Sequence, residues 1–235
     1  MADQSWIDKG EYWVTDAEQM SEFWHAARSC RVTGSKIGGL VGHSIFSDPG
    51  KTAREIAGVF NPSITSYKEN MMKDGIVMEP YAREWYAGVI GKHITEMGLA
   101  VPKWDVRFGT SVDGIISDTA ICEIKVPHKM YSLLIDHRKR MSNGDKFDKY
   151  YHAHIWDTHY DQMQLGMVVT NTRMCHYVVY MPSKDPSIPK DVYCEIVHFN
   201  PNYWELLYSD AGGKYEELII PIMKEYGLSR VDPPK

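Results

Sequence analysis

The sequence predicts an α/β fold with a central mixed β-sheet flanked by helices. Helical periodicity dominates the first 90 residues, short strand-like segments follow from residue 93, and helical and strand patterns then alternate to about residue 226. The 235 residues are 43% hydrophobic and 24% charged, which is typical of a globular chain long enough to bury a core. We expect a single domain over 1–235, with its core at about 15–226 and a frayed tail at 227–235.

The first part of the chain is expected to be largely helical. Thr15 and Glu18 form a capping box, which predicts a helix over about 15–28 with Met20 in its apolar stripe. Further helices are expected over 36–41, 51–60 and about 69–89, the first of them after a turn at 33–35. Pro80 interrupts the longest pattern. We expect a kink or restart there, because proline lacks an N–H and clashes with the preceding turn.

The rest of the chain supplies the strands and the remaining helices. Strands are expected at 94–97, 104–109, 112–116, 120–126, 176–181 and 192–198, with the tightest turn at 117–119. Helices are expected at about 129–140, 154–169, 203–209 and 214–226. This order of elements indicates a sheet covered by helices.

Composition excludes several classes of protein. The net charge of −5 and the pI of about 6.1 argue against a chain coated in nucleic acid, although a local basic channel for DNA is compatible with them. The four cysteines are scattered without a C-x-x-C pair, which argues against a zinc site or a disulfide framework and favours a reducing, intracellular compartment. No run of 18 apolar residues and no signal-peptide pattern occurs.

Three charged residues converge in the strand region. Side chains alternate along a strand, so Glu123 and Lys125 share a face, and a hairpin through the turn at 117–119 brings Asp113 beside them. Burying unpaired charge is costly and two carboxylates repel each other, whereas a divalent cation such as Mg²⁺ or Mn²⁺ relieves both costs. The lysine could then orient a water and stabilise charge on a phosphate. The alternative is a surface salt bridge between Glu123 and Lys125.

Four sequence blocks resemble one known family. An aspartate, nine intervening residues and then Glu-x-Lys resemble the PD-(D/E)xK nuclease signature, with Val112 in place of the proline. In order along the chain, the four blocks are Trp24–Arg28 with Val32–Ile37, Gly75–Arg83, Ser111–Pro127 and Tyr160–Gln164. Together they are similar to the lambda exonuclease, or YqaJ-type viral recombinase, family. The resemblance implies a restriction-endonuclease-like core, and the stretch between Pro127 and His154 is longer than in lambda exonuclease.

The resemblance implies roles for residues around the charged cluster. Asp113, Glu123 and the Ile124 backbone carbonyl would be metal ligands, and Lys125 would position the attacking water. The corresponding helical glutamate is Glu79, a further metal or water partner in a site with two Mg²⁺ ions, for which Mn²⁺ would substitute. An exposed helix carboxylate is the alternative for Glu79.

The resemblance also implies residues that contact DNA. Arg28 and Ser35, with Thr33 in the same block, would hold a 5′ phosphate, since a guanidinium grips phosphate oxygens and a turn hydroxyl completes an anion pocket. The alternative is that Arg28 only neutralises the end of its own helix. Gln162 would brace the lysine or the attacking water from the neighbouring helix. Gln164 would contact DNA, although it could equally be a packing residue. The other residues that would contact DNA are His159, Arg138, Lys139 and Arg140. The last three belong to the basic segment 128–150, whose alternative is a solvated loop.

The function implied is a Mg²⁺-dependent 5′-to-3′ exonuclease on linear double-stranded DNA ends. It would leave 3′ single-stranded overhangs for viral or phage-type recombination and DNA repair. The expected partners are DNA ends, further copies of the chain in a ring-like homo-oligomer, typically a trimer, and a single-strand annealing protein. The expected compartment is the cytoplasm of a bacterial host or a virus-infected cell, with the nucleus as an alternative. A PD-(D/E)xK endonuclease and a catalytically inactive DNA-end-binding protein are the alternative functions.

Overall fold

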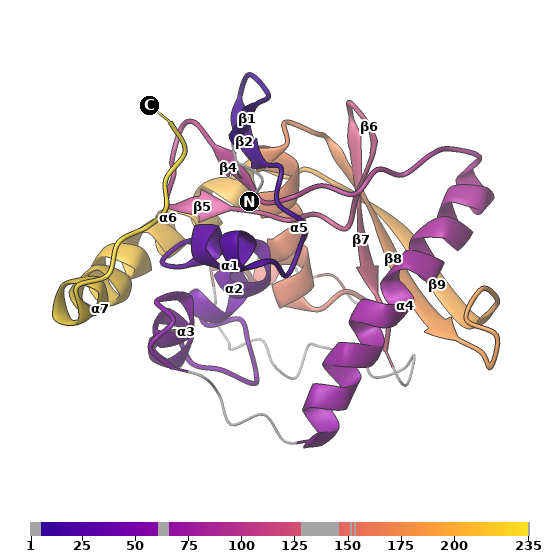
Figure 1. The fold of residues 1–235 in the computed structure, drawn as a ribbon, viewed down its shortest axis with the longest axis horizontal. Helices are drawn as coiled ribbons and strands as arrows, with labels where there is room; N and C mark the ends of the chain where they lie inside the picture. The colour runs from indigo at the N-terminus through magenta and orange to yellow at the C-terminus, as the bar shows by residue number, and fades with distance from the viewer. Residues whose placement is uncertain (1–5, 61–65, 128–145, 151, 153, 235) are drawn as a thin grey trace.

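The structure is a computed structural model that describes residues 6–60, 66–127, 146–150, 152 and 154–234 (Figure 1). Its helices are α1 (Glu22–Arg28), α2 (Gly34–Leu40), α3 (Pro49–Ile56), α4 (Ser66–Ile90), α5 (Asp157–Val169), α6 (Pro201–Lys214) and α7 (Ile220–Tyr226). A 3₁₀ turn covers Asp148–Tyr150, and a π-helical turn at Tyr215–Ile219 joins α6 to α7. The helix expected at 129–140 lies outside the described residues.

The strands form three sheets. They are β1 (Trp6–Asp8), β2 (Tyr12–Thr15), β3 (Val32–Thr33), β4 (Ala100–Pro102), β5 (Phe108–Gly109), β6 (Gly114–Ser117), β7 (Ala120–Lys125), β8 (Met174–Pro182) and β9 (Pro189–His198). The main sheet has the order β6-β7-β8-β9, in which β7 and β8 are parallel and the outer pairs are antiparallel. The order β1-β2-β4 forms an antiparallel sheet, and β3 pairs with β5 in parallel. The mixed α/β class expected from the sequence is confirmed.

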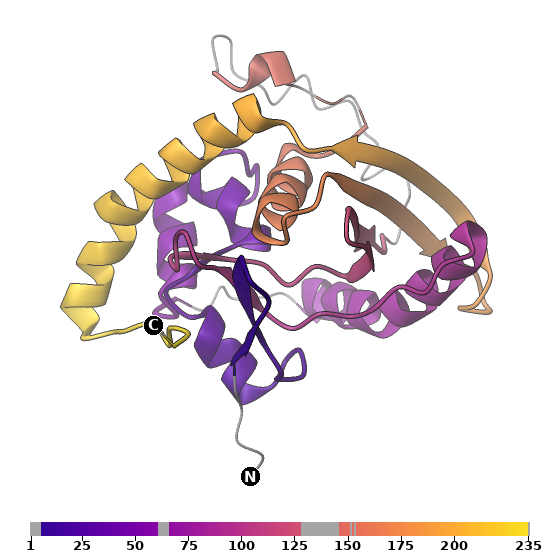
Figure 2. The ribbon, with the colours of Figure 1, turned by 90° about the horizontal axis from the view of Figure 1, so that it is seen from above.

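Helices cover both faces of the main sheet (Figure 2). Alternation along β7 sends Ile121 into the core cluster on the α5 side, whereas Cys122 and Ile124 join the cluster formed with α4. Glu123 and Lys125 therefore share the α5 face with Ile121, because side chains two residues apart lie on one face of a strand.

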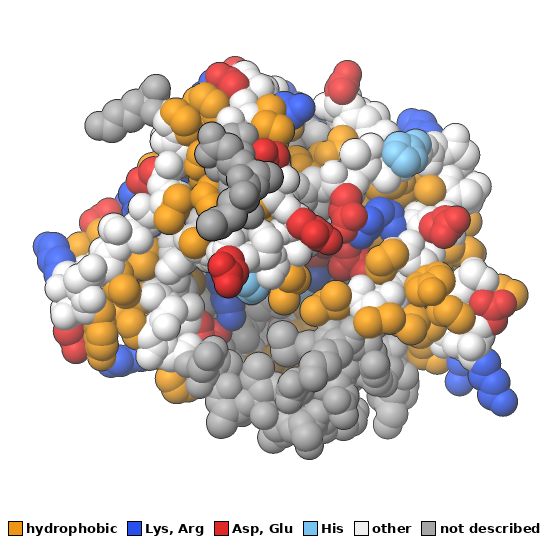
Figure 3. Space-filling view, viewed as in Figure 1, with side chains coloured by type: hydrophobic (Ala, Val, Ile, Leu, Met, Phe, Trp, Pro, Cys, Tyr) orange, Lys and Arg blue, Asp and Glu red, His pale blue; other side chains and the backbone are white. Residues whose placement is uncertain are grey.

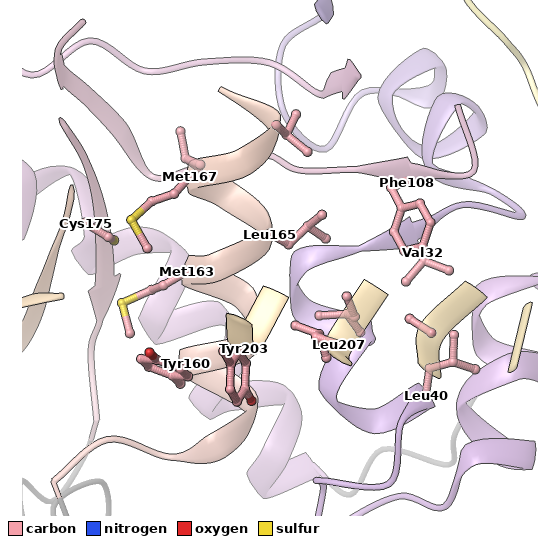
Figure 4. Packing of buried hydrophobic residues seen from close by; sticks show 14 of the residues in the cluster. Val32, Leu40, Phe108, Tyr160, Met163, Leu165, Met167, Cys175, Tyr203 and Leu207 are labelled. Carbon is pink, nitrogen blue, oxygen red and sulfur yellow. The ribbon is translucent and has the colours of Figure 1, made fainter. Parts of the chain in front are cut away.

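Helix α5 is the centre of the larger core (Figure 4). Met163, Leu165 and Met167 are almost fully buried, and the core around them includes Leu40 of α2 and Leu207 of α6. None of the helices in the described part of the chain combines the length and the apolar character needed to cross a bilayer.

The helix expected from the capping box at Thr15 is wrong over its first turns. Thr15 ends strand β2, and its hydroxyl accepts a hydrogen bond from Leu99 N at 3.0 Å instead of capping a helix. Helix α1 begins after Ser21, whose Oγ accepts from Trp24 N at 3.3 Å. Met20, expected in the apolar stripe, is 54% exposed with a φ of 69°.

Helix α4 runs through Pro80 without the expected restart. The proline removes one N–H donor, which leaves the carbonyl of Ile76 without its helical partner. Both residues are exposed, so water can satisfy that carbonyl, and the sheet-facing side of the helix keeps its packing through Ala82 and Tyr86.

The end of the chain is not the frayed tail expected from its composition. The guanidinium of the fully buried Arg31 donates to the Val231 carbonyl at 3.0 Å and to Asp232 Oδ1 at 3.1 Å. Arg230 also donates to Asp232, from Nε at 3.1 Å. Residues 230–232 are thereby held against the beginning of β3.

The strands differ from the expected ones in number and in length. The expected strand at 104–109 contracts to β5, and the one at 94–97 contributes one isolated bridge between Thr95 and Ile115. Strands β8 and β9 are longer than expected, and the sequence does not predict β1, β2, β3 and β4.

Candidate active site

The candidate site is centred on the end of β7. Lys125 Nζ makes an ion pair with Glu123 Oε1 on the same face of the strand. Glu123 is 3% exposed and lies opposite Tyr177 of β8 in the register of the parallel pair. The pair therefore lies at the end of an inner strand with its carboxylate buried, and it is not the surface salt bridge considered as the alternative.

Asp113 is fixed against the same strand from the start of β6. Its Oδ2 accepts a hydrogen bond from Ile124 N at 2.6 Å. The next residue, Gly114, pairs with Cys122, and a Cβ there would lie 2.2 Å from Ile94 Cγ2. Glycine at this position lets the segment at Ile94 pack closely on the start of β6, while the hydrogen bond from Ile124 N holds Asp113 against β7.

Helix α5 supplies Gln162 from the layer that covers this face. Its Oε1 accepts a hydrogen bond from Lys125 Nζ at 3.3 Å. The α2 backbone at Gly34 comes so close that an added Cβ would lie 2.9 Å from Gln162 Cγ. Lys125 is thus held between a carboxylate on its own strand and an amide oxygen on α5.

Helix α4 contributes Glu79 from the other layer. Arg83 NH2 donates to Glu79 Oε1 at 2.8 Å and to Glu96 Oε1 at 3.1 Å. Arg83 is not among the residues expected from the sequence, although the i,i+4 spacing from Glu79 was a signal for this pair. Figure 3 shows acidic and basic side chains gathered where α4 faces β6 and β7.

Burial, and then the charge of neighbouring carboxylates, raises the pKa values of the carboxyl groups in the site. Burial and then the charge of Asp113 raise the pKa of Glu79 to about 7, and burial and then the charge of Glu123 raise the pKa of Asp113. Burial also raises the pKa of Glu123, against the opposing charge of Lys125. For Lys125, burial alone would lower the pKa, but Glu123 and Asp113 outweigh it and the pKa rises.

The donor set fits a divalent cation by its chemistry. Three carboxyl groups repel one another in a poorly hydrated site, and a hard cation with oxygen ligands relieves that repulsion. Within the described ranges, however, no three His, Cys, Asp or Glu side chains form a metal-binding group as they stand. Asp113 accepts from Ile124 N through Oδ2 and Glu123 pairs with Lys125 through Oε1, which leaves the second oxygen of each carboxylate as a candidate ligand.

A second cluster surrounds Arg28 at the end of α1. Its guanidinium donates to Ser111 Oγ at 3.3 Å, Thr33 Oγ1 at 3.2 Å and Ser35 Oγ at 3.4 Å. It also lies 4.2 Å from the centroid of the Trp24 ring, and burial lowers its pKa to about 10. Among the residues that the structure places, no carboxylate pairs with Arg28.

Ser111 links this cluster to the charged site. Its Oγ also accepts a hydrogen bond from Trp24 Nε1 at 3.1 Å, and it lies two residues before Asp113. Ser111 and Trp24 are not among the site residues expected from the sequence, although both fall in the blocks that resemble the family. A cation surrounded by three hydroxyl groups is a suitable receptor for an anion.

Two other residues of α5 differ in their surroundings. His159 Nδ1 lies 2.9 Å from Tyr177 Oη, on the same side of α5 as Gln162. Gln164 is fully buried, and its amide donates to the His198 carbonyl at 3.1 Å and accepts from Asn200 N at 2.8 Å. These contacts match the packing alternative for Gln164. Arg138, Lys139 and Arg140 lie outside the described residues.

Comparison with known proteins relates the chain to one family. The model of the YqaJ-like viral recombinase domain matches residues 23–173, which includes every block quoted from the sequence. A comparison with curated proteins finds no match.

Solved structures share the fold. The alkaline exonuclease LHK-Exo from Laribacter hongkongensis is 22% identical, with a TM-score of 0.62 over 88% of this chain and 98% of that chain. Its complex with dAMP gives a TM-score of 0.63 at the same identity and coverage. A phage-related exonuclease from Haemophilus somnus 129PT is 13% identical, with a TM-score of 0.56 over 82% of this chain and 96% of that chain.

Proposed function

The chain belongs to the YqaJ-like viral recombinase family, and on that premise we propose that it is a divalent-metal-dependent 5′-to-3′ exonuclease acting on linear double-stranded DNA ends. The product would be a duplex with a 3′ single-stranded overhang. The observation that carries the proposal is the convergence of Asp113, Glu123, Lys125, Glu79 and Gln162 from β6, β7 and two covering helices. The family and its structural neighbours support a phage-type exonuclease.

The carboxylates are the proposed cation ligands. Asp113, Glu123 and the Ile124 carbonyl would hold Mg²⁺, and Glu79 would bind a second ion or a water. Bound Mg²⁺ would supply a lowered pKa for the attacking water and charge neutralisation at the phosphate. The protein side of this arrangement is a set of oxygen donors whose pKa values are raised by burial and by the charge of neighbouring carboxylates.

Lys125 is the proposed water-positioning group. Its raised pKa keeps the ammonium protonated at neutral pH, so it can donate hydrogen bonds to a water and to a phosphate oxygen. The hydrogen bond to Gln162 fixes the direction of the side chain. A cation bound by Glu123 would weaken its ion pair with Lys125 and leave the ammonium available to the substrate.

The cluster around Arg28 is the proposed 5′-phosphate pocket. Its guanidinium can bind two phosphate oxygens, and the hydroxyls of Ser111, Thr33 and Ser35 can donate further hydrogen bonds. A pocket that binds the 5′ phosphate next to the cleavage site would set the 5′-to-3′ direction. The ring-like homo-oligomer, typically a trimer, and the annealing partner remain proposals from the family resemblance.

A cleavage time course tests the proposal. A linear duplex would carry a phosphate at one 5′ end and a hydroxyl at the other, with a covalently closed circle as the control and Lys125→Ala as the paired variant. We expect mononucleotides from the linear DNA only, fastest from the phosphorylated end, with Mg²⁺ required and the variant inactive. Cleavage of the circle would support an endonuclease, and end binding without cleavage by either Mg²⁺ or Mn²⁺ would support an inactive end-binding protein.

A further inference from the structure

A groove opens at the carboxyl ends of the parallel strands β7 and β8. Val126 and Pro127 leave β7 directly after Lys125, while Met181 and Pro182 end β8. In open α/β sheets, ligands bind beyond the carboxyl ends of parallel strands, because the connecting segments diverge there. The groove lies at that position, and the residue that borders it from α4 is Met78, which directly precedes Glu79.

The walls of the groove combine apolar and cationic groups. The groove has a volume of about 440 Å³. The apolar part of its lining includes Met78, Val126, Pro127 and Met181. Val126 also packs against the buried cluster between α4 and the sheet, so the groove is the open continuation of that cluster. Lys184 and Lys190 border it from the β8–β9 hairpin.

The two lysines are available for a ligand. Both are exposed, and within the part of the chain that the structure covers neither ammonium makes an ion pair. The neighbouring acids are directed elsewhere: Asp185 Oδ1 accepts from Ser187 N at 3.0 Å inside the hairpin turn, and Asp191 alternates with Lys190 along β9. Neither aspartate lines the groove.

We propose that this groove binds the phosphodiester backbone of the DNA strand on the side of the cleavage site away from the Arg28 cluster. The inference rests on the proposed nuclease function. Lys184 and Lys190 would contact two phosphates, and the methionine and proline surface would contact the sugars. Met78 and Val126 directly adjoin Glu79 and Lys125 in the sequence, so the contact would lie close to the charged site, where it would hold the strand in register after each nucleotide is removed.

Binding measurements with matched variants test the groove. Fluorescence anisotropy would measure the affinity for a labelled blunt duplex in EDTA at several salt concentrations. The proteins compared are the wild type, the groove variant that carries both Lys184→Gln and Lys190→Gln, and a control variant that carries both Lys92→Gln and Lys224→Gln. The second pair removes the same charge from exposed lysines that do not line the groove. Melting temperatures would verify that each variant is folded.

We expect the groove variant to bind at least about tenfold more weakly, with a slope of log affinity against log salt that is smaller by about 1.8, or about 0.9 for each lost phosphate contact. The control pair should keep the wild-type slope. Wild-type slope and affinity in the groove variant, or an equal loss in the control pair, would overturn the groove while leaving the nuclease intact. A wild-type protein that neither binds nor cuts the duplex would instead overturn the proposed function itself.

Discussion

Arg83 lies between two carboxylates and controls the charge of one of them. Burial raises the pKa of Glu79, whereas the ion pair with Arg83 lowers it. The same guanidinium donates to Glu96, so the arginine is held from two sides. We infer that Arg83 is a positioning residue, because its contacts reach the site only through Glu79.

Replacing Arg83 should therefore change both rate and pH dependence. Loss of a charge-assisted hydrogen bond of about 1.5–3 kcal/mol predicts a kcat for Arg83→Met that is lower by a factor of about 10–150. The pH of half-maximal activity should rise, because the carboxyl of Glu79 loses the charge that lowers its pKa. Arg83→Lys should recover part of both effects. A pH–rate profile of Arg83→Met that coincides with the wild type would contradict this role.

Ser111 is expected to affect the preference for the chemistry of the DNA end. Its hydroxyl lies within hydrogen-bond distance of both Arg28 and Trp24 in the proposed phosphate pocket. Ser111→Ala should reduce the ratio of rates on 5′-phosphate and 5′-hydroxyl ends by about tenfold, since one hydrogen bond to a charged group is worth about 1.5 kcal/mol. Ser209→Ala, on the exposed side of α6, is the control and should keep the wild-type ratio. An unchanged ratio for Ser111→Ala would remove the serine from the pocket.

At the scale of elements, α2 and α5 pack so closely that glycine is required between them. A Cβ on Gly38 would lie 2.6 Å from Asp161 Oδ2 and 2.9 Å from Thr158 Cα. This contact fixes α5, and α5 in turn positions Gln162.

Gly38→Ala should destabilise the protein by about 1–3 kcal/mol, because the helices must move apart to accept the methyl group. Gly88→Ala is the matched control on α4, where a Cβ would meet nothing within 4 Å. It should stabilise the protein by about 0.5–1 kcal/mol through helix propensity. Urea unfolding of both variants measures these changes, and equal effects of the two substitutions would refute the packing argument.

Local patterns predicted the parts of the site that depend on neighbours in sequence. The period of two residues along a strand placed Glu123 and Lys125 on one face, and a short hairpin brought Asp113 to them. The Thr15 capping box failed because the hydroxyl of Thr15 bonds Leu99, 84 residues away. A sequence motif shows which local hydrogen bonds a side chain can make, but it does not show a distant backbone group that bonds the same side chain instead. The Arg28–Ser111 contact, which joins residues 83 apart, was missed for the same reason.

At the scale of the whole molecule, a short segment of chain joins two clusters of opposite charge. The cationic cluster at Arg28 and the carboxylates at Asp113, Glu123 and Glu79 are connected by the segment from Ser111 to Asp113. A net charge of −5 gives the chain little general attraction for DNA. Binding must therefore depend on local cations, and a divalent ion at the carboxylates would reduce their repulsion of DNA, so the molecule should respond to pH and metal together.

Glu79 gives this response a definite sign. Its ordinary pKa is 4.5, and in the folded protein the pKa rises to about 7, so between these values the folded state binds more protons than the unfolded state. Stability then falls as the pH rises through this range, because the unfolded state is favoured as protons are lost. In metal-free buffer, the free energy of unfolding of the wild type should decrease by up to about 3 kcal/mol from pH 4.5 to pH 7.5 on this account.

Glu79→Gln removes this titrating group and should make the decrease smaller when urea unfolding is repeated across the same pH range, leaving the part that comes from the raised pKa values of Asp113 and Glu123. Mg²⁺ should act in the opposite direction, because it binds the ionised carboxylates and displaces their protons. Its stabilising effect on the wild type should therefore be larger at pH 8 than at pH 5. The difference would be about 2.7 kcal/mol if the Mg²⁺ concentration is a hundred times the dissociation constant at pH 8 and Mg²⁺ does not bind at pH 5. Asp113→Asn should abolish most of this Mg²⁺ effect. Equal stabilisation by Mg²⁺ at both pH values would show that the ion binds elsewhere, since only a site of partly protonated carboxyl groups couples its affinity to pH in this range.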